Sequence, residues 1–339
     1  IRVSYADIVL AAAVPALLYY VIVFMSVHFQ AHRYNVGLLA EEHISAFGAV
    51  FLRGWYYLIP VIVLIYFLVV RALPPGIAGV YACLSVLATS FLSRDRSHWL
   101  TPWRIMQAFD SGVARWVVIA SITAAVGIMI GALELSGVGI KISRFIIELS
   151  NGDLYLTLIL VGIVSLIVGM GLDATPAYIT LATLLAPALV QLGVPPMAAH
   201  LYVVYWGLAS FFTPPTCIAV FVTCSISGSK VWETGWEAVK LGIAAFLVPV
   251  AFVLEPALLL NGSPARIALA TCTALIGAVA LAAGIRGYAL DVLNPLQRIM
   301  MGIAGILFIL PGLLYPAIGA ALALAALAMG YARTRAAAR

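Results

Sequence analysis

Two short segments combine helix-breaking residues with oxygen-bearing side chains inside otherwise apolar sequence. The first reads GMGLDATP over residues 169–176, and the second reads TPPT over residues 213–216. Glycine lets a chain bend and proline removes a backbone donor, so each segment predicts an interrupted helix. The carbonyls and hydroxyls freed at such interruptions are hard oxygen ligands of the kind that a Na⁺ ion requires. We therefore expect an ion site at these two breaks.

Asp173 is the residue in these segments whose position is hardest to explain without a function. A carboxylate at the bilayer centre costs roughly 2.5–3.5 kcal/mol on insertion scales, so Asp173 is not expected to face lipid. It could contribute to an ion site, or it could cap the helix that begins near Pro176 by accepting backbone N–H bonds. The TPPT segment likewise has a simpler interpretation as a proline kink. Two breaks at the same depth favour a site.

Other chemically capable residues have more ordinary interpretations. His200, Tyr202, Tyr205 and Trp206 precede the second break and suit packing or a membrane interface. The four cysteines lie in apolar runs without a CxxC pair, so a disulfide or a resident metal is not expected. The sequence contains no GxxxxGK[ST], HExxH or GxSxG. We therefore predict no catalytic residues and no cofactor, and transport energy would come from an ion gradient.

Composition shows which solvent must surround the elements that carry these segments. Of the 339 residues, 64% are hydrophobic and only 9% are charged, whereas soluble domains carry about 25% charged residues. A helix that crosses the bilayer needs about 20 apolar residues, and the chain has room for many such helices. The net charge of +5 does not indicate nucleic acid, because the basic residues sit in short loops between helices. An all-α, polytopic membrane protein is predicted.

The apolar runs place the breaks within specific helices. Helices are expected over residues 8–30, 54–71, 76–93, 113–133, 154–170, 177–190, 197–228, 241–260, 267–285, 297–311 and 314–331. The runs 154–170 and 177–190 are short for separate crossings, which favours a re-entrant hairpin, although two short full crossings remain an alternative. The 197–228 run is too long for one crossing and is broken at TPPT. The segments 31–53 and 134–153 are amphipathic and suit the membrane interface, and residues 94–116 are expected to form a cytoplasmic connection.

The distribution of Lys and Arg gives an orientation. With the hairpin, one face receives 13 of the 18 basic residues, among them Arg33, Lys240, Arg286 and Arg298. The other face receives five, including Lys141 and Arg144. The positive-inside rule assigns the richer face to the cytoplasm. Three parts follow: membrane helices over 1–133, partly scaffold; a transport domain over 134–228; and C-terminal membrane helices over 229–339.

The hairpin block resembles a known family. GMGLDATPAYITLATLLAPALVQLGVPPMAAHLYVVYWGLASFFTPPTCIAV is similar to the second hairpin and following broken helix of the large membrane subunit of tripartite ATP-independent periplasmic (TRAP) transporters. PALLYYVIVFMSVHFQAHR, LRGWYYLIPVIVLIYFLVV and VKLGIAAFLVPVAFVLEPALLL resemble its subgroup of fused permeases, which work with TAXI-type binding proteins. The resemblance covers nearly the whole chain.

The resemblance implies a Na⁺-coupled importer of a small organic anion, a carboxylate, in the inner membrane of a bacterial or archaeal cell. A separate periplasmic solute-binding protein would deliver the solute, and a transport domain would move against a scaffold as an elevator. Carried over by motif, the residues around one Na⁺ site and the substrate would be Gly169, Gly171, Asp173, Thr175, Ser210, Thr213, Pro214 and Thr216.

One departure from the family pattern affects the expected function. The family has a first hairpin and a first broken helix, related to these by an inverted repeat, and neither precedes Ile1. The chain is therefore expected to correspond to the C-terminal half of a fused permease, with an N-terminal half as a partner. Alternatives are another inverted-repeat ion transporter or a remnant subunit that acts only in assembly. An intramembrane enzyme is disfavoured because no nucleophile is paired with a base.

Overall fold

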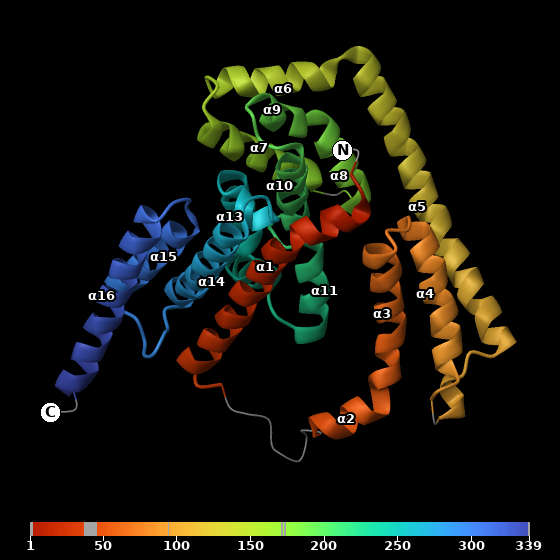
Figure 1. Cartoon of the computed structure of the whole chain (residues 1–339), viewed down its shortest axis with the longest axis horizontal. Helices are drawn as coiled ribbons and strands as arrows, with labels where there is room; N and C mark the ends of the chain where they lie inside the picture. The colour runs from red at the N-terminus through yellow and green to blue at the C-terminus, as the bar shows by residue number, and fades with distance from the viewer. Residues whose placement is uncertain (1–2, 37–45, 94, 171, 173, 338–339) are drawn as a thin grey trace. The chain divides into compact units, whose positions relative to one another are not determined.

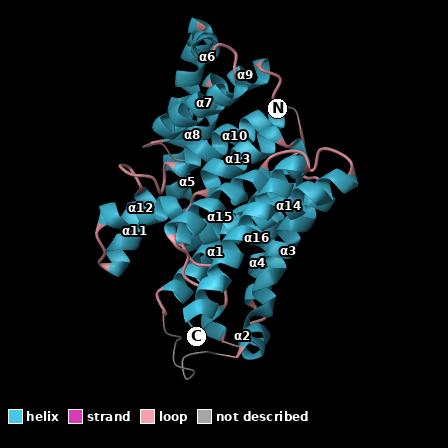
Figure 2. Ribbon diagram, turned by 90° about the vertical axis from the view of Figure 1, so that its left-hand side faces the viewer, coloured by secondary structure: helices cyan, strands magenta, loops and turns pink. Residues whose placement is uncertain are grey.

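The structure is a computed structural model that describes residues 3–36, 46–93, 95–170, 172 and 174–337. Over these ranges the regular secondary structure is helical, with an isolated bridge between Tyr288 and Val292 (Figure 2). Six helical stretches in this part of the chain are apolar and long enough to cross a membrane: 5–33, 50–70, 174–191, 231–254, 264–286 and 314–332. The prediction of an all-α, polytopic membrane protein is confirmed.

The chain divides into two compact units. Unit 1 comprises the described residues of 1–10 and 37–124, and unit 2 comprises those of 11–36 and 125–339. Two long helices, α1 (Tyr5–Arg33) and α5 (Pro102–Ser136), each contribute to both units. The predicted division at residues 133 and 228 stays a prediction.

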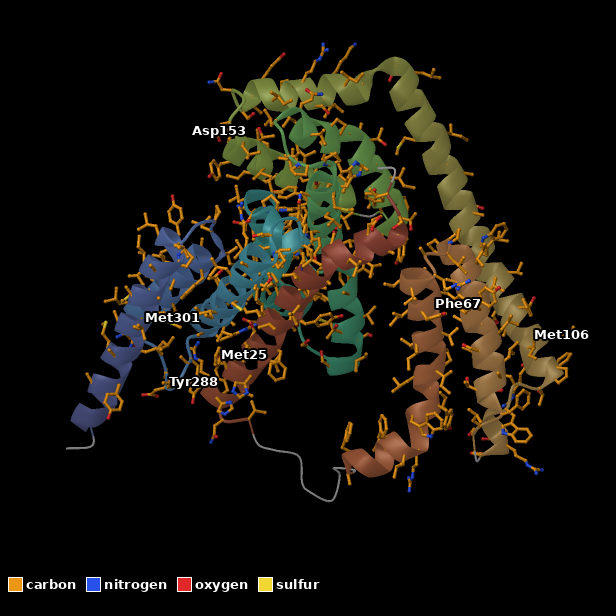
Figure 3. The ribbon with its side chains drawn as sticks, in the orientation of Figure 1. Met25, Phe67, Met106, Asp153, Tyr288 and Met301 are labelled. Carbon is orange, nitrogen blue, oxygen red and sulfur yellow. The ribbon has the colours of Figure 1, made fainter. Side chains whose placement is uncertain are left out.

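Unit 1 is built on a helical pair. In addition to the first part of α5 it contains α2 (Phe47–Gly54), α3 (Leu58–Ile65) and α4 (Pro75–Ser90). The α3 helix continues as a π-helical turn to Val70 and packs along α4, where Phe67 stacks on Tyr81 with ring centroids 4.2 Å apart (Figure 3).

The loop expected over 94–116 is helical for much of its length, because α5 already begins at Pro102, while its cytoplasmic location stays a prediction. Proline is well tolerated at the first position of a helix, where its missing N–H would have no intrahelical acceptor. Charged residues along this stretch indicated a loop, but a helix that extends beyond the lipid has no need to be apolar.

Unit 2 contains the remaining helices. These are α6 (Val138–Leu149), α7 (Leu154–Gly169), α8 (Ala174–Leu184), α9 (Ala186–Gln191), α10 (Pro196–Ala209), α11 (Ile218–Ser227), α12 (Val231–Leu241), α13 (Ala244–Leu254), α14 (Pro264–Arg286), α15 (Pro295–Ile309) and α16 (Leu314–Ala337). The amphipathic helix expected within 134–153 is present as α6. One helix was predicted over 241–260. In the structure α12 ends at Leu241, the chain turns at Gly242, and α13 follows from Ala244 to Leu254.

The core of unit 2 surrounds α10. Helices α7, α8, α9 and α13 all pack against it (Figure 1). Tyr202 of α10 is fully buried, and its hydroxyl donates a hydrogen bond of 2.7 Å to the carbonyl of Leu158 in α7. This bond satisfies a buried polar group and joins two helices far apart in sequence.

The predicted breaks coincide with the observed helix ends. The first helix of the expected hairpin ends at Gly169, and the second begins at Ala174, three residues earlier than predicted. Together α8 and α9 form an apolar stretch of 18 residues, which is longer than expected. The predicted interruption at TPPT separates α10 from α11. Whether the hairpin is re-entrant remains a prediction.

The last three helices form a tight group through small residues and caps. A Cβ atom added to Gly277 of α14 would lie 2.8 Å from the carbonyl oxygen of Gly305 in α15, so glycine permits close approach of the two backbones. Asn294 and Gln297 form a capping box at the start of α15, and the Gln297 amide donates to the Ala326 carbonyl of α16 at 2.8 Å. The buried contacts extend to α1 around Met25, Tyr288 and Met301 (Figure 3).

Candidate functional site

The end of α7, at the first predicted break, lies against Gly207 of α10. Gly169 ends α7, and a Cβ atom added to it would lie 2.5 Å from the Gly207 carbonyl oxygen and 3.0 Å from its Cα. The same carbonyl accepts the Ser210 hydroxyl at 2.7 Å and the Ser210 N–H at 3.3 Å. The end of the first half-helix therefore lies against the last turn before the second break.

Glycines allow this contact by keeping three helices close. Gly162, two turns before the end of α7, lies against the Trp206 indole, where an added Cβ would approach ring atoms to 2.8 Å. On the opposite helix, a Cβ at Gly207 would lie 2.5 Å from Leu181 Cδ1 of α8. The contact of Gly169 with Gly207 is between backbones and leaves no room for a larger side chain at 169, whereas the Leu181 side chain could shift to make room at 207.

The hydroxyl groups of the second break bind backbone carbonyls. Thr213 donates to the Ala209 carbonyl at 2.7 Å, and Thr216 makes a longer contact of 3.5 Å with the Ser210 carbonyl. The Ala209 carbonyl also accepts the N–H groups of Phe212 and Thr213, at 3.3 and 3.1 Å, so the Thr213 hydroxyl adds to a carbonyl that already has backbone partners. A hydroxyl that donates one hydrogen bond retains oxygen lone pairs, so each could still contribute an oxygen ligand to a cation.

A cavity of about 240 Å³ lies between α8 and α10. Its lining is mainly apolar and includes Thr175, Tyr178, Leu181 and Gly207. The Tyr178 hydroxyl lies 3.1 Å from Nδ1 of His200 in α10. This contact orients the Tyr178 ring, which lines the cavity. Small-molecule sites commonly combine an apolar lining with a few placed polar groups.

Two fully or nearly buried hydroxyls in this bundle have no hydrogen-bond partner within the described part of the chain. They belong to Ser165 of α7, with no exposed surface, and Thr180 of α8, which is 5% exposed. An unsatisfied buried hydroxyl costs about 1–3 kcal/mol. The helices that carry the breaks therefore hold two buried hydroxyl groups that could bind a further polar group.

The eight predicted site residues do not all converge. Gly169 and Ser210 meet at Gly207, and Thr175 lines the adjacent cavity. Thr216 reaches back to Ser210 and Thr213 to Ala209. Pro214 instead packs toward α12, since a Cβ at Gly235 would lie 2.8 Å from Pro214 Cγ. Gly171 and Asp173 lie outside the described residues.

Sequence reasoning missed Gly207 and Tyr178. Gly207 lies one helical turn before Ser210, and a glycine so close to a predicted break was a usable signal for close backbone approach. Tyr178 follows Pro176 by two residues, but nothing local to it indicates that it would reach His200 on another helix.

Comparison with known proteins identifies the family of the chain. The family model described as "Tripartite ATP-independent periplasmic transporter, DctM component" matches residues 1–260. The chain is also 23% identical over 245 residues to "Uncharacterized protein YgiK" of Salmonella typhimurium, an alignment that covers 72% of this chain and 55% of that protein. The chain thus spans about half the length of the curated relative it matches.

No solved structure matches the chain significantly. The family match covers the helices of the breaks and ends before α14. From the extent of that match, the chain belongs to the DctM component family of tripartite ATP-independent periplasmic transporters, a family of membrane transport permeases.

Proposed function

We propose that the chain forms part of a permease that couples Na⁺ entry to uptake of a small organic anion. The observation that carries this proposal is the contact of Gly169 with Gly207, whose carbonyl also binds Ser210. Non-helical backbone at membrane depth is tolerated where protein or an aqueous cavity covers it. We infer that the two interruptions would together supply a protein-enclosed group of oxygen atoms.

Na⁺ is the proposed coupling ion because the available ligands are oxygens. Carbonyls at the end of α10 and the hydroxyls of Ser210, Thr213 and Thr216 supply hard, uncharged donors. Asp173 would add charge from the first break. Each positive charge that moves inward down the membrane potential releases about 2.3 kcal/mol per 100 mV, which can drive solute accumulation.

A small carboxylate suits the neighbouring cavity. The N-terminus of α8 begins at Ala174, which lines the cavity together with Thr175. The helix dipole favours an anion at a half-helix N-terminus. The Tyr178 hydroxyl, which already contacts His200 Nδ1, would add a polar contact, while Leu181 and Val204 would contact the carbon skeleton of the solute.

A periplasmic solute-binding protein is the proposed source of the solute. The α6 helix exposes Lys141 and Arg144 one turn apart, next to the exposed apolar residue Phe145. Together with residues 191–196 at the other end of the hairpin, this helix would form the docking surface. We further propose the TAXI-type subgroup, an elevator motion of 134–228, and the inner membrane of a bacterial or archaeal cell.

A second permease half is part of the same proposal. The matched relative is almost twice as long as the aligned region, and inverted-repeat transporters build their substrate site between two repeats. The chain would supply one hairpin and one broken helix, and the other half would complete the site.

Transport by reconstituted vesicles tests this function. The complete permease is inserted in vesicles, and uptake of labelled carboxylates is measured with and without a Na⁺ gradient and the cognate binding protein. Uptake that requires both supports the proposal. Full uptake without the binding protein would exclude a tripartite mechanism, and uptake without Na⁺ would exclude Na⁺ coupling.

A role in assembly alone is the second candidate. The coverage of only 55% of the relative favours it, because a chain with one hairpin could stabilise a partner without moving solute. Expression of the partner half with and without this chain distinguishes the two. If this chain raises the partner's abundance but its Gly169 and Thr213 variants leave uptake unaltered, assembly is its function.

A further inference from the structure

A polar cavity of about 260 Å³ lies in unit 2, away from the helix breaks. It lies where α1 and α14 end, where α15 begins and beside the last turn of α12. Four basic side chains line it, Arg33, Lys240, Arg286 and Arg298, together with the carboxylate of Glu237. One acid against four bases leaves a formal excess of three positive charges.

Internal contacts hold these cations in place without neutralising them. Arg33 donates to the carbonyl of Arg286, and Arg298 donates to the carbonyls of Gly284 and Ile285 at 3.1 and 2.8 Å. These acceptors are the free carbonyls at the end of α14, which carry only partial negative charge.

Glu237 provides the full negative charge in the cavity. Its two oxygens bind different bases, Arg286 Nη1 at 2.8 Å and Lys240 Nζ at 2.6 Å. The cavity is therefore organised around one carboxylate, and the surplus positive charge remains available to a bound anion.

Arg286 has an unused hydrogen-bond donor in this cavity. Its side chain is only 7% exposed, and its Nε has no hydrogen-bond partner among the residues that the structure describes. A buried donor on a charged group is costly when unpaired. An anion oxygen within the cavity would pair with this N–H and with neighbouring guanidinium groups.

From this cluster we propose that the cavity binds a phosphate-bearing anion. Guanidinium groups bind phosphate oxygens through paired, charge-assisted hydrogen bonds. The four bases belong to the group that the Lys and Arg distribution assigns to the cytoplasmic face, where anionic lipids are concentrated. Trp232 and Trp236, also in α12, are both half or more exposed, as in an interfacial aromatic belt.

The site joins the part of the chain that matches the family to the part that does not. Arg33, Glu237 and Lys240 lie within residues 1–260, whereas Arg286 and Arg298 lie in the helices after that match. A phosphate bound between them would fasten α14 and α15 to α1 and α12. Bound ligand should therefore raise the thermal unfolding midpoint of the full chain.

The test measures ligand binding by the purified, delipidated full chain in detergent. Phosphatidylglycerol, phosphatidylcholine with the same acyl chains and inorganic phosphate are each titrated, and the unfolding midpoint is followed. The variant is Lys240→Gln, which removes one cation of the cavity. Lys230→Gln is the matched control, because Lys230 also pairs with a glutamate three residues along α12 at 3.1 Å but lies outside the cavity.

We expect phosphatidylglycerol to raise the midpoint, with affinity about fivefold weaker in Lys240→Gln and unaltered in Lys230→Gln. Glu237→Gln should bind more tightly by a similar factor, which loss of structure alone would not produce. A response to inorganic phosphate with the same variant pattern would support the site with a soluble anion as its ligand. Equal responses to the two lipids, or equal affinities in Lys240→Gln and Lys230→Gln, would overturn the proposal. The experiment requires no transport, so it is independent of the proposed uptake function.

Discussion

Gly169 lies against Gly207 so closely that a single methyl group at position 169 would stand 2.5 Å from the Gly207 carbonyl oxygen. The contact brings the end of one half-helix to the last turn of another. It also explains why position 169 is glycine, since Gly169 does not adopt a backbone conformation that itself requires one.

Substitution of Gly169 should therefore destabilise the protein. Gly169→Ala would force α7 away from α10, and overpacking of this kind costs about 1–3 kcal/mol. Gly302→Ala is the matched control, because an added Cβ there meets no atom within 4 Å. That control should be neutral or stabilising by up to about 1 kcal/mol. Thermal unfolding in detergent measures both, and equal midpoints would contradict the tight contact.

Cysteine labelling tests the re-entrant hairpin. Leu149 at the end of α6 and Gln191 at the end of α9 are exposed and flank the hairpin. In a background without the four native cysteines, Leu149→Cys and Gln191→Cys should both react with an impermeant thiol reagent from outside. Lys230→Cys, on the predicted cytoplasmic face, should not react. Labelling of 149 and 191 from opposite sides would show two full crossings instead.

Charge reversal on α6 tests the docking surface. Lys141→Glu combined with Arg144→Glu should raise the concentration of binding protein needed for half-maximal uptake, because exposed charges act mainly on association. The effect should shrink at high salt. Lys230→Glu should leave the concentration dependence unaltered. If the α6 variant also behaves like wild type, the binding protein docks elsewhere.

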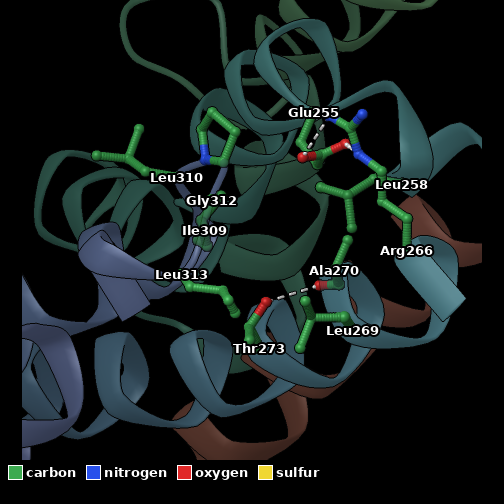
Figure 4. A pocket seen from close by; sticks show the side chains of 11 residues that line it. Glu255, Leu258, Arg266, Leu269, Ala270, Thr273, Ile309, Leu310, Gly312 and Leu313 are labelled. Carbon is green, nitrogen blue, oxygen red and sulfur yellow. Dashed lines mark hydrogen bonds and ion pairs between the residues drawn. The ribbon is translucent and has the colours of Figure 1, made fainter. Parts of the chain in front are cut away.

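The ion pair between Glu255 and Arg266 makes a prediction about stability. Arg266 Nε and Nη2 bind the two Glu255 oxygens at 3.0 and 3.1 Å, and the Glu255 side chain is 7% exposed (Figure 4). Arg266→Gln would leave a buried carboxylate without its cation, which we expect to cost about 1–3 kcal/mol.

Lys230→Gln again serves as the control for that pair. It removes the ion pair with Glu233, in which both side chains are more than two-thirds exposed. Such pairs contribute under about 1 kcal/mol. A thermal midpoint for Arg266→Gln no lower than that of Lys230→Gln would show that Glu255 finds another partner or becomes protonated.

The breaks were predictable because their signal is local. Glycine and proline interrupt helices wherever they occur together, so the ends of α7 and α10 followed from GMGLDATP and TPPT. The turn at Gly242 was missed, because one glycine in an apolar run is a weak signal. Only the packed structure shows that Phe212 leaves no room for a side chain there.

Sequence patterns could not predict the contacts between residues far apart in the chain. The approach of Gly169 to Gly207 depends on the rotation of α7 about its axis, and hydropathy does not determine rotation in a helix that is apolar on all sides. The pairing of Arg286 with Glu237 likewise depends on the packing of α14 near α12. The distribution of Lys and Arg assigned Arg286 to the cytoplasmic face but could not identify Glu237 as its partner.

The Na⁺ dependence of uptake tests the central claim most directly, that the two breaks form one ion site. Thr213→Val removes a hydroxyl that donates to the carbonyl four residues earlier, at 2.7 Å. Thr183→Val removes a hydroxyl that donates to the carbonyl four residues earlier at 2.9 Å, but near the end of α8 that adjoins α9, away from both breaks. Asp173→Asn removes charge at nearly constant shape.

Initial uptake by the complete permease is measured against external Na⁺ concentration in vesicles with matched expression. We predict that Thr213→Val or Asp173→Asn raises the half-saturating Na⁺ concentration by up to about tenfold, as expected for the loss of an ion ligand worth about 1.4 kcal/mol, while Thr183→Val leaves it unaltered. Wild-type Na⁺ dependence in both Thr213→Val and Asp173→Asn would contradict an ion site at the breaks and leave these residues with structural roles alone.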